Sequence, residues 1–183
     1  LIQLINDSIG TKQKLTCVSR PRRFGKSFAA QMLCAYYDKT CDSSPLFDDL
    51  EIAADQKINN TYLQHLNKYD VIYLDMTGII GAADIDNIVP FIIRNVTREL
   101  AAAYPGLDIQ EAFFGTLANA AELTENRFIM IIDEWDAPIR EAIGHPAVQK
   151  EYLEFLRSLF KNSGTTDKIF AAAYMTGILP IKK

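Results

Sequence analysis

The most informative stretch of the chain is Cys17-Val18-Ser19-Arg20-Pro21-Arg22-Arg23-Phe24-Gly25-Lys26-Ser27. It ends in Gly-Lys-Ser, follows a short apolar run and precedes a segment with helical spacing of apolar residues, which is the setting of a phosphate-binding loop. Gly25 lets the backbone approach a phosphate, Lys26 offers a positive charge to the outer phosphates, and the Ser27 hydroxyl can ligate Mg²⁺. The usual loop opens with Gly where this chain has Arg20, so Gly-Lys-Ser alone is a weak match.

A second motif supplies the acidic partner that such loops require. The run Phe128-Ile129-Met130-Ile131-Ile132-Asp133-Glu134 is a hydrophobic strand that ends in two carboxylates. The first carboxylate can hold Mg²⁺, often through water, and the second can orient a water for attack on a γ-phosphate. The two motifs together favour a nucleotide site over a coincidence.

The remaining pattern predicts an α/β fold. Four apolar runs are predicted to be buried strands: Leu15–Ser19, Val71–Asp75, Phe128–Asp133 and Ile169–Met175. Helical patterns lie between them: Lys26–Tyr37 with Phe28 in its apolar stripe, Asn59–Lys68, Ile85–Tyr104 with Pro90 inside, Asp108–Leu123 and Ala147–Lys161. Alternating strands and helices predict a mostly parallel sheet with helices on both faces. Ligands bind such sheets at the carboxyl ends of the strands, where the loop, Asp75, Asp133-Glu134 and Thr176 all fall.

Charge narrows the class of ligand. The 183-residue chain has a formal net charge of -4 and is long enough for one domain with a core, but its net charge argues against a general nucleic-acid-binding surface. No acidic residue occurs between Asp7 and Asp38, and that window holds the basic residues Lys12, Lys14, Arg20, Arg22, Arg23 and Lys26. A local basic patch on an acidic protein favours a compact anionic ligand, although a solvated basic turn would have the same composition.

The cysteines and the hydropathy point to a cytoplasmic setting. Cys17, Cys34 and Cys41 have no metal-ligand spacing, and an odd number of cysteines is typical of reduced thiols. Cys17 lies in an apolar run, so we expect it to be a small core residue. The mean hydropathy is -0.01, and no apolar run approaches the roughly 20 residues that cross a bilayer.

At its motifs the chain resembles the AAA-ATPase-like family. The resemblance rests, in order along the chain, on Arg20–Ser27 (RPRRFGKS), Val71–Gly78 (VIYLDMTG), Ile131–Pro138 (IIDEWDAP) and Tyr174–Gly177 (YMTG). Arg is normal at position 20 in this family. The resemblance implies a three-layer P-loop NTPase-like fold, with ATP and Mg²⁺ as ligands. Many members carry a PD-(D/E)XK nuclease-like domain further along the chain.

The resemblance and the chemistry imply the same roles for the site residues. The nucleotide-binding residues are Arg20, Pro21, Arg22, Arg23, Phe24, Gly25, Lys26 and Ser27. Lys26 should contact the β- and γ-phosphates, and Ser27 and Asp133 should hold Mg²⁺. Glu134 should position the hydrolytic water. Thr176 occupies a sensor-like place, where a hydroxyl can reach the γ-phosphate or the water, unless it is only a polar strand end.

Other polar residues near the motifs have competing interpretations. Arg20, Arg22 and Arg23 could cover the phosphates, meet a neighbouring subunit, or pair with Asp133 or Asp136 when no nucleotide is bound. Asp136 precedes Ala137-Pro138 and is expected to be a helix N-cap. We expect Asp75 to cap a loop with Thr77, and Trp135, Tyr36 and Tyr37 to be packing residues.

The function expected from the sequence is an ATP-binding domain that hydrolyses ATP to drive a conformational change in a larger protein. The chain starts at Leu1 and stops soon after its last strand-like run. We therefore expect a fragment, with a fifth core strand and any nuclease-like domain beyond Lys183. The alternatives are a non-hydrolysing nucleotide switch, an interaction module with a vestigial site, and a P-loop kinase. A water-activating Glu134 weighs against the kinase.

Overall fold

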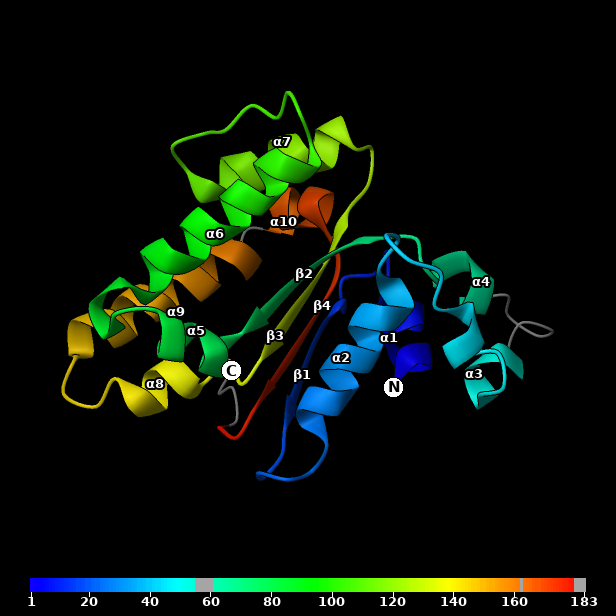
Figure 1. The fold of residues 1–183 in the computed structure, drawn as a ribbon, viewed down its shortest axis with the longest axis horizontal. Coiled ribbons are helices and arrows are strands. Elements are labelled where there is room, and N and C mark those ends of the chain that lie inside the picture. Colours follow the sequence, from blue (N-terminus) through cyan, green and yellow to red (C-terminus); the bar gives the residue numbers. More distant parts are fainter. Residues whose placement is uncertain (55–60, 162, 180–183) are drawn as a thin grey trace.

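A four-stranded, wholly parallel sheet forms the centre of the molecule (Figure 1). The computed structural model describes residues 1–54, 61–161 and 163–179. The strands are β1 (Leu15–Ser19), β2 (Asp70–Asp75), β3 (Phe128–Asp133) and β4 (Phe170–Gly177). Their order across the sheet is β1-β4-β3-β2. The prediction of a parallel α/β sheet is therefore confirmed.

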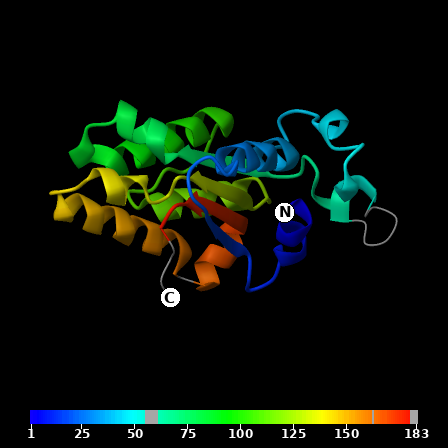
Figure 2. The ribbon, with the colours of Figure 1, turned by 90° about the horizontal axis from the view of Figure 1, so that it is seen from below.

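Helices cover both faces of this sheet. They are α1 (Ile2–Ser8), α2 (Lys26–Tyr37), α3 (Glu51–Ala54), α4 (Thr61–His65), α5 (Met76–Ala82), α6 (Ile88–Ala103), α7 (Phe113–Leu123), α8 (Ala137–Glu141), α9 (Pro146–Phe160) and α10 (Ser163–Ile169), with short 3₁₀ turns at Ser44–Leu46 and Ile85–Asn87. Figure 2 shows the sheet between α2 on one side and α9 and α10 on the other.

Two apolar cores lie on the two faces of the sheet. Alternate residues of β3 point to opposite sides: Met130 and Ile132 join the core under α5–α7, α9 and α10, whereas Ile129 and Ile131 join the core under α1, α2 and α4. Every residue of β3 and of β4 is buried. These central strands therefore read as continuous apolar runs because both of their faces are covered.

The edge strand β1 is more exposed than its sequence predicts. Leu15 is 39% exposed, and Cys17 is also exposed, so the expected core role of Cys17 is wrong. Within the described residues β1 pairs only with β4, which leaves its outer edge uncovered. An apolar sequence cannot reveal by itself whether a strand lies at the edge or in the centre of a sheet.

Most predicted helices are present, with shifted ends. The helix predicted at 85–104 starts as a 3₁₀ turn, and α6 begins at Ile88. Pro90 therefore lies in the first turn of α6, where a missing N–H breaks no helical hydrogen bond. The helix predicted to begin at Asp108 begins at Phe113, because the Gln110 N–H and C=O both pair with the Thr116 hydroxyl, at 3.0 and 3.2 Å.

Three further differences concern the other elements. The predicted helix 59–68 is observed as α4, Thr61–His65, and residues 59 and 60 lie outside the described residues. β4 runs to Gly177 because its end pairs with the end of β1, Gly177 opposite Ser19. Phe28 is 75% exposed and does not join the buried side of α2, which is formed by Ala30, Leu33, Tyr36 and Tyr37.

Candidate nucleotide-binding site

The segments at the carboxyl ends of β1, β2 and β3 line one cavity of about 770 Å³. The strand register places Asp75 opposite Asp133, and Val18 opposite Thr176. The charged and loop residues that line the cavity are Arg22, Arg23, Gly25, Lys26, Ser27, Asp75, Asp133, Glu134, Arg140 and Glu141. Sites for small molecules and cofactors commonly span about 300–1,000 Å³. The cavity is therefore large enough for a compact anionic ligand.

The loop between β1 and α2 has the backbone of an anion-binding turn. Gly25 is the N-cap of α2 with φ 71°, and Arg23 also has a left-handed φ of 67°. A left-handed arginine costs about 1 kcal/mol of strain, a feature that clusters at functional sites. Because α2 starts at Lys26, its free N–H groups and its positive dipole end face the cavity.

Lys26 lies across its own loop. Its Nζ donates to the carbonyl oxygen of Pro21 at 3.2 Å and lies 3.2 Å from the Oε1 atom of Glu134. The Lys26 side chain is only 4% exposed. The predicted phosphate-binding lysine and the predicted water-activating glutamate are thus in direct contact.

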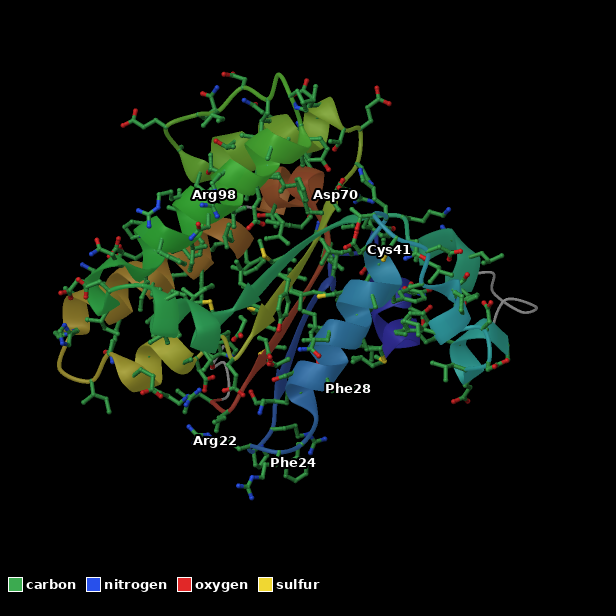
Figure 3. The ribbon with its side chains drawn as sticks, in the orientation of Figure 1. Arg22, Phe24, Phe28, Cys41, Asp70 and Arg98 are labelled. Carbon is green, nitrogen blue, oxygen red and sulfur yellow. The ribbon has the colours of Figure 1, made fainter. Side chains whose placement is uncertain are left out.

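The loop arginines are exposed and leave the acidic residues to other partners. Among the described residues, no ion pair joins Arg20, Arg22 or Arg23 to Asp133 or Asp136. The Arg20 N–H donates to the carbonyl of Gly177 at 3.1 Å, which ties the loop to the end of β4. Figure 3 shows Arg22 and Phe24 at the tip of the loop, at the end of the sheet far from Arg98 and Cys41.

Thr176 holds the turn that follows β3. Its hydroxyl donates to Asp133 Oδ1 and accepts from the Glu134 N–H at 3.1 Å, and its carbonyl accepts from the Trp135 N–H at 2.8 Å. Thr176 is completely buried and is not among the residues that line the cavity. The hydroxyl predicted to reach a phosphate or a water instead orients the two carboxylate residues.

Glu134 adopts a strained backbone and contacts two cations. Its φ of 54° is left-handed, a conformation that non-glycine residues rarely adopt. Its Oε1 faces Lys26, and its Oε2 accepts from Arg140 Nη2 at 2.8 Å. The sequence patterns did not predict a role for Arg140 at this site. The available signal was its place four residues after Asp136 on the following helix, a spacing at which opposite charges meet.

Asp136 occupies the N-cap position of α8 as predicted, but its side chain makes no capping bond. Its Oδ2 accepts from the Ile178 and Leu179 N–H groups, at 3.0 and 2.8 Å, and lies 3.3 Å from Arg140 Nε. Asp136 is completely buried. The predicted N-cap position is therefore confirmed, but the carboxylate turns back to hold the chain that leaves β4 and makes no capping bond.

Other residues near the motifs behave as expected, with one exception. Asp75 Oδ1 accepts from the Thr77 and Gly78 N–H groups, at 3.0 and 3.1 Å, and so caps α5. Trp135, Tyr36 and Tyr37 are buried packing residues. Lys14 is the exception: it is 4% exposed, and its Nζ lies 2.7 Å from Asp167 Oδ1 and donates to the Phe170 carbonyl at 2.9 Å. Lys14 directly precedes β1, at the end of the strand away from the cavity, so the basic residues between Asp7 and Asp38 do not form one patch.

The comparison with known families agrees with this geometry. The AAA-ATPase-like family, described as "Predicted AAA-ATPase", matches residues 3–183. The chain belongs to this family. Membership supports a nucleotide-binding, ATPase-like function in general terms.

Individual relatives add little detail. The AAA-ATPase-like chain is 23% identical over 168 residues to an "Uncharacterized protein in vnfD 5'region" of Azotobacter chroococcum mcd 1. The match covers 91% of this chain and 31% of that relative, so the chain spans about a third of the relative's length. No solved structure matches.

The side chains of this AAA-ATPase-like chain fit Mg²⁺ bound together with phosphates. Among the described residues no group of three or more His, Cys, Asp or Glu side chains is arranged to hold a metal ion. The Ser27 hydroxyl and the Asp133 carboxylate nevertheless line the same cavity. Mg²⁺ is commonly held by one or two such oxygen ligands, with substrate phosphates and water completing its octahedron.

Two further observations bear on the surroundings of the site. Burial, and then the nearby carboxylates of Asp133 and Asp75, raise the pKa of Tyr73 in the cavity wall to about 12, so its hydroxyl stays neutral at physiological pH.

Across the described part of the AAA-ATPase-like chain, no single helix has the length and apolar character to cross a membrane. In that part, only α5 together with Ile85–Ala103 is long and apolar enough, and this pair is bent by 119°.

Proposed function

We propose that this chain is an ATP-binding domain that hydrolyses ATP with Mg²⁺ and thereby drives a conformational change in a larger protein. The observation that carries the proposal is the 3.2 Å contact between Lys26 Nζ and Glu134 Oε1 in a cavity at the carboxyl ends of the strands. It joins the two motifs of the sequence, which are far apart along the chain. Membership in a family described as AAA-ATPase supports the same conclusion.

Each residue has a role in this proposal. Lys26 and the N–H groups at the start of α2 bind the outer phosphates, and the exposed Arg22 and Arg23 add positive charge at the cavity wall. Ser27 and Asp133 would hold Mg²⁺, which neutralises phosphate charge when bound. Glu134 accepts a hydrogen bond from the attacking water and takes up its proton. Thr176 keeps Asp133 and Glu134 in position.

The wider assignment rests on the length of the relative and on the family resemblance. Because the chain spans 31% of the matched relative, we propose that residues 1–183 form one ATPase domain of a longer protein. A C-terminal nuclease-like domain, through which nucleic acid would be reached, and a cytoplasmic location are parts of the same proposal. Three free cysteines are consistent with a reducing compartment.

The experiment compares ATP turnover and nucleotide binding in the full-length protein and in two variants. Lys26→Ala should lose both binding and turnover, because it removes the phosphate-binding charge. Glu134→Gln should still bind ATP but hydrolyse it about 10²–10⁴ times more slowly, the usual contribution of a general base. Equal ATP turnover in all three proteins would contradict the proposal.

One observation favours a second candidate, a nucleotide switch that does not hydrolyse. Both oxygens of Glu134 contact cations, Lys26 on one side and Arg140 on the other. A glutamate held in this way after nucleotide binding would be a poor base. Tight ATP binding without phosphate release by the full-length protein would support the switch and exclude the ATPase.

A further inference from the structure

One carboxylate, that of Glu134, is shared between two cations that both line the cavity, Lys26 and Arg140. Lys26 Nζ lies 3.2 Å from Oε1, and Arg140 Nη2 lies 2.8 Å from Oε2. The three side chains are 4%, 18% and 20% exposed for Lys26, Glu134 and Arg140 respectively. They are thus largely shielded from water. Removing one partner of a shielded ion pair is strongly destabilising, because the other charge is left without compensation.

The two cations are held very differently. Arg140 is anchored from behind: its Nε lies 3.3 Å from Asp136 Oδ2, an ion-pair contact without hydrogen-bond alignment. Asp136 is in turn completely buried and fixed by two backbone N–H groups, those of Ile178 and Leu179. Lys26 has a flexible stem, and its second partner is only the carbonyl of Pro21. The arginine side is therefore the fixed end of the contact and the lysine side the movable end.

Binding of an anionic ligand sets these contacts in competition. Lys26 can serve a phosphate only if its hold on Glu134 loosens. A Glu134 that then had no cation partner would face a phosphate of the same charge within the cavity, and this repulsion opposes binding. Arg140 removes this conflict because it keeps one carboxylate oxygen occupied while Lys26 turns to the ligand.

We propose that Arg140 is a positioning residue for Glu134: it holds the carboxylate in place so that Lys26 can pass to the phosphates of a nucleotide, and it is not itself a phosphate ligand. The nature of the ligand in this inference rests on the proposed function above. The contact between Arg140 and Glu134 does not, because the structure shows it directly, at 2.8 Å.

The first test is a double-mutant cycle on binding, which needs no turnover. Calorimetry measures the affinity of a non-hydrolysable ATP analogue with Mg²⁺ for the wild type, Arg140→Gln, Glu134→Gln and the double variant. Arg140→Gln should weaken binding about tenfold or more when Glu134 is present, and less than about twofold in the Glu134→Gln background. Arg140→Lys should recover part of the loss, because it keeps the charge without the planar fork.

Three results would overturn the inference. A similar loss in both backgrounds would make Arg140 a direct phosphate ligand, and no loss in either would remove its role. Failure of Arg140→Lys to bind better than Arg140→Gln would mean that the charge is irrelevant. Arg98→Gln is the matched control, because Arg98 is an exposed arginine on α6, far from the loop (Figure 3).

A second measurement separates this inference from the proposed function. Urea unfolding of the same four proteins without nucleotide gives the coupling between Arg140 and Glu134 directly. We expect the two single substitutions to be non-additive, with the double variant more stable than their sum predicts. If the wild type did not bind the ATP analogue, the proposed function would fail. The double-mutant cycle on urea unfolding would still decide whether Arg140 holds Glu134. Additive effects would overturn the inference.

Discussion

At the scale of single residues, Thr176 does more than its place in the sequence suggests. One buried hydroxyl joins the carboxylate of Asp133 to the backbone N–H of Glu134, and the same residue's carbonyl holds Trp135. These bonds fix a turn in which Glu134 has a left-handed φ of 54°. Strain of this kind persists only where neighbouring contacts over-determine the backbone. Thr176 supplies those contacts from a different strand.

Replacing the Thr176 hydroxyl by a methyl group tests this assignment. Thr176→Val keeps the shape and volume but leaves a buried carboxylate oxygen and a buried N–H without their partner. We expect a loss of about 1–3 kcal/mol in the free energy of unfolding. Thr176→Ser, which retains the hydroxyl, should lose much less. Urea denaturation measures both, and equal stability of the valine variant and the wild type would contradict the assignment.

At the scale of elements, the end of β4 packs against the turn between β3 and α8. Gly177 is the last residue of β4, and its N-terminal neighbours hold the acidic turn. A Cβ atom at Gly177 would lie 2.6 Å from the indole Nε1 of Trp135 and 2.9 Å from Asp136 Oδ1. The close approach of these two elements therefore requires glycine at this position, for reasons of space.

Gly177→Ala should push the two elements apart. Because Trp135 and Asp136 are both buried, neither can move away without disturbing its own contacts. We expect a loss of about 1–3 kcal/mol, the usual cost of overpacking. Gly164→Ala on α10 is the matched control, since among the described residues nothing beyond its chain neighbours and its own helix backbone lies within 4 Å of the added Cβ. Thermal unfolding compares the two, and equal midpoints would show that the β4 end is not tightly packed.

At the scale of the whole molecule, buried polar contacts tie three helices of the N-terminal part of the chain to one another. Tyr37 donates to Asn6 at 2.8 Å, Asn6 donates to Tyr36 at 3.0 Å, and Tyr36 donates to the carbonyl of Tyr62 at 2.8 Å. These bonds connect α1, α2 and α4, which are distant in the sequence. His65 on α4 lies beside this core, with Nδ1 2.7 Å from the hydroxyl of Tyr69.

The buried His65 makes stability depend on pH. Burial lowers its pKa below the ordinary value of 6.5. As the pH falls below 6.5, the unfolded chain takes up the proton first, and the folded state loses stability until the pH reaches the lower, folded pKa. We expect the drop in the free energy of unfolding between pH 7.5 and pH 5.5, both chosen to bracket about 6.5, to be smaller in His65→Gln than in the wild type.

Urea denaturation at the two pH values checks this prediction. His145→Gln is the control, because the His145 side chain at the start of α9 is 45% exposed and contacts the exposed Asp86 at 3.2 Å. An unchanged pH dependence in His65→Gln would mean that other groups account for the loss at low pH.

Local patterns along the chain predict the four strands and several of the helices, and they indicate where a site could form. The strands, α2 and the Gly25-Lys26-Ser27 and Asp133-Glu134 motifs depend on local apolar patterns and short spacings, which are readable along the chain. Parallel strands bring their carboxyl ends to one edge, so the meeting of these motifs was predictable as well. The exposure of β1 could not be predicted from the sequence, because a strand's position in the sheet depends on which other strands pair with it.

Which side chains contact one another at the site depends on how the strands are ordered in the folded molecule. The order β1-β4-β3-β2 inserts β4 between the strand before the loop and the strand before the acidic turn. That insertion buries Thr176 against Asp133 and turns Asp136 toward the end of β4. It leaves Glu134 between Lys26 and Arg140, an arrangement set by residues from three separate elements. Contacts of this kind depend on strand order and register, and no local pattern in the sequence encodes either.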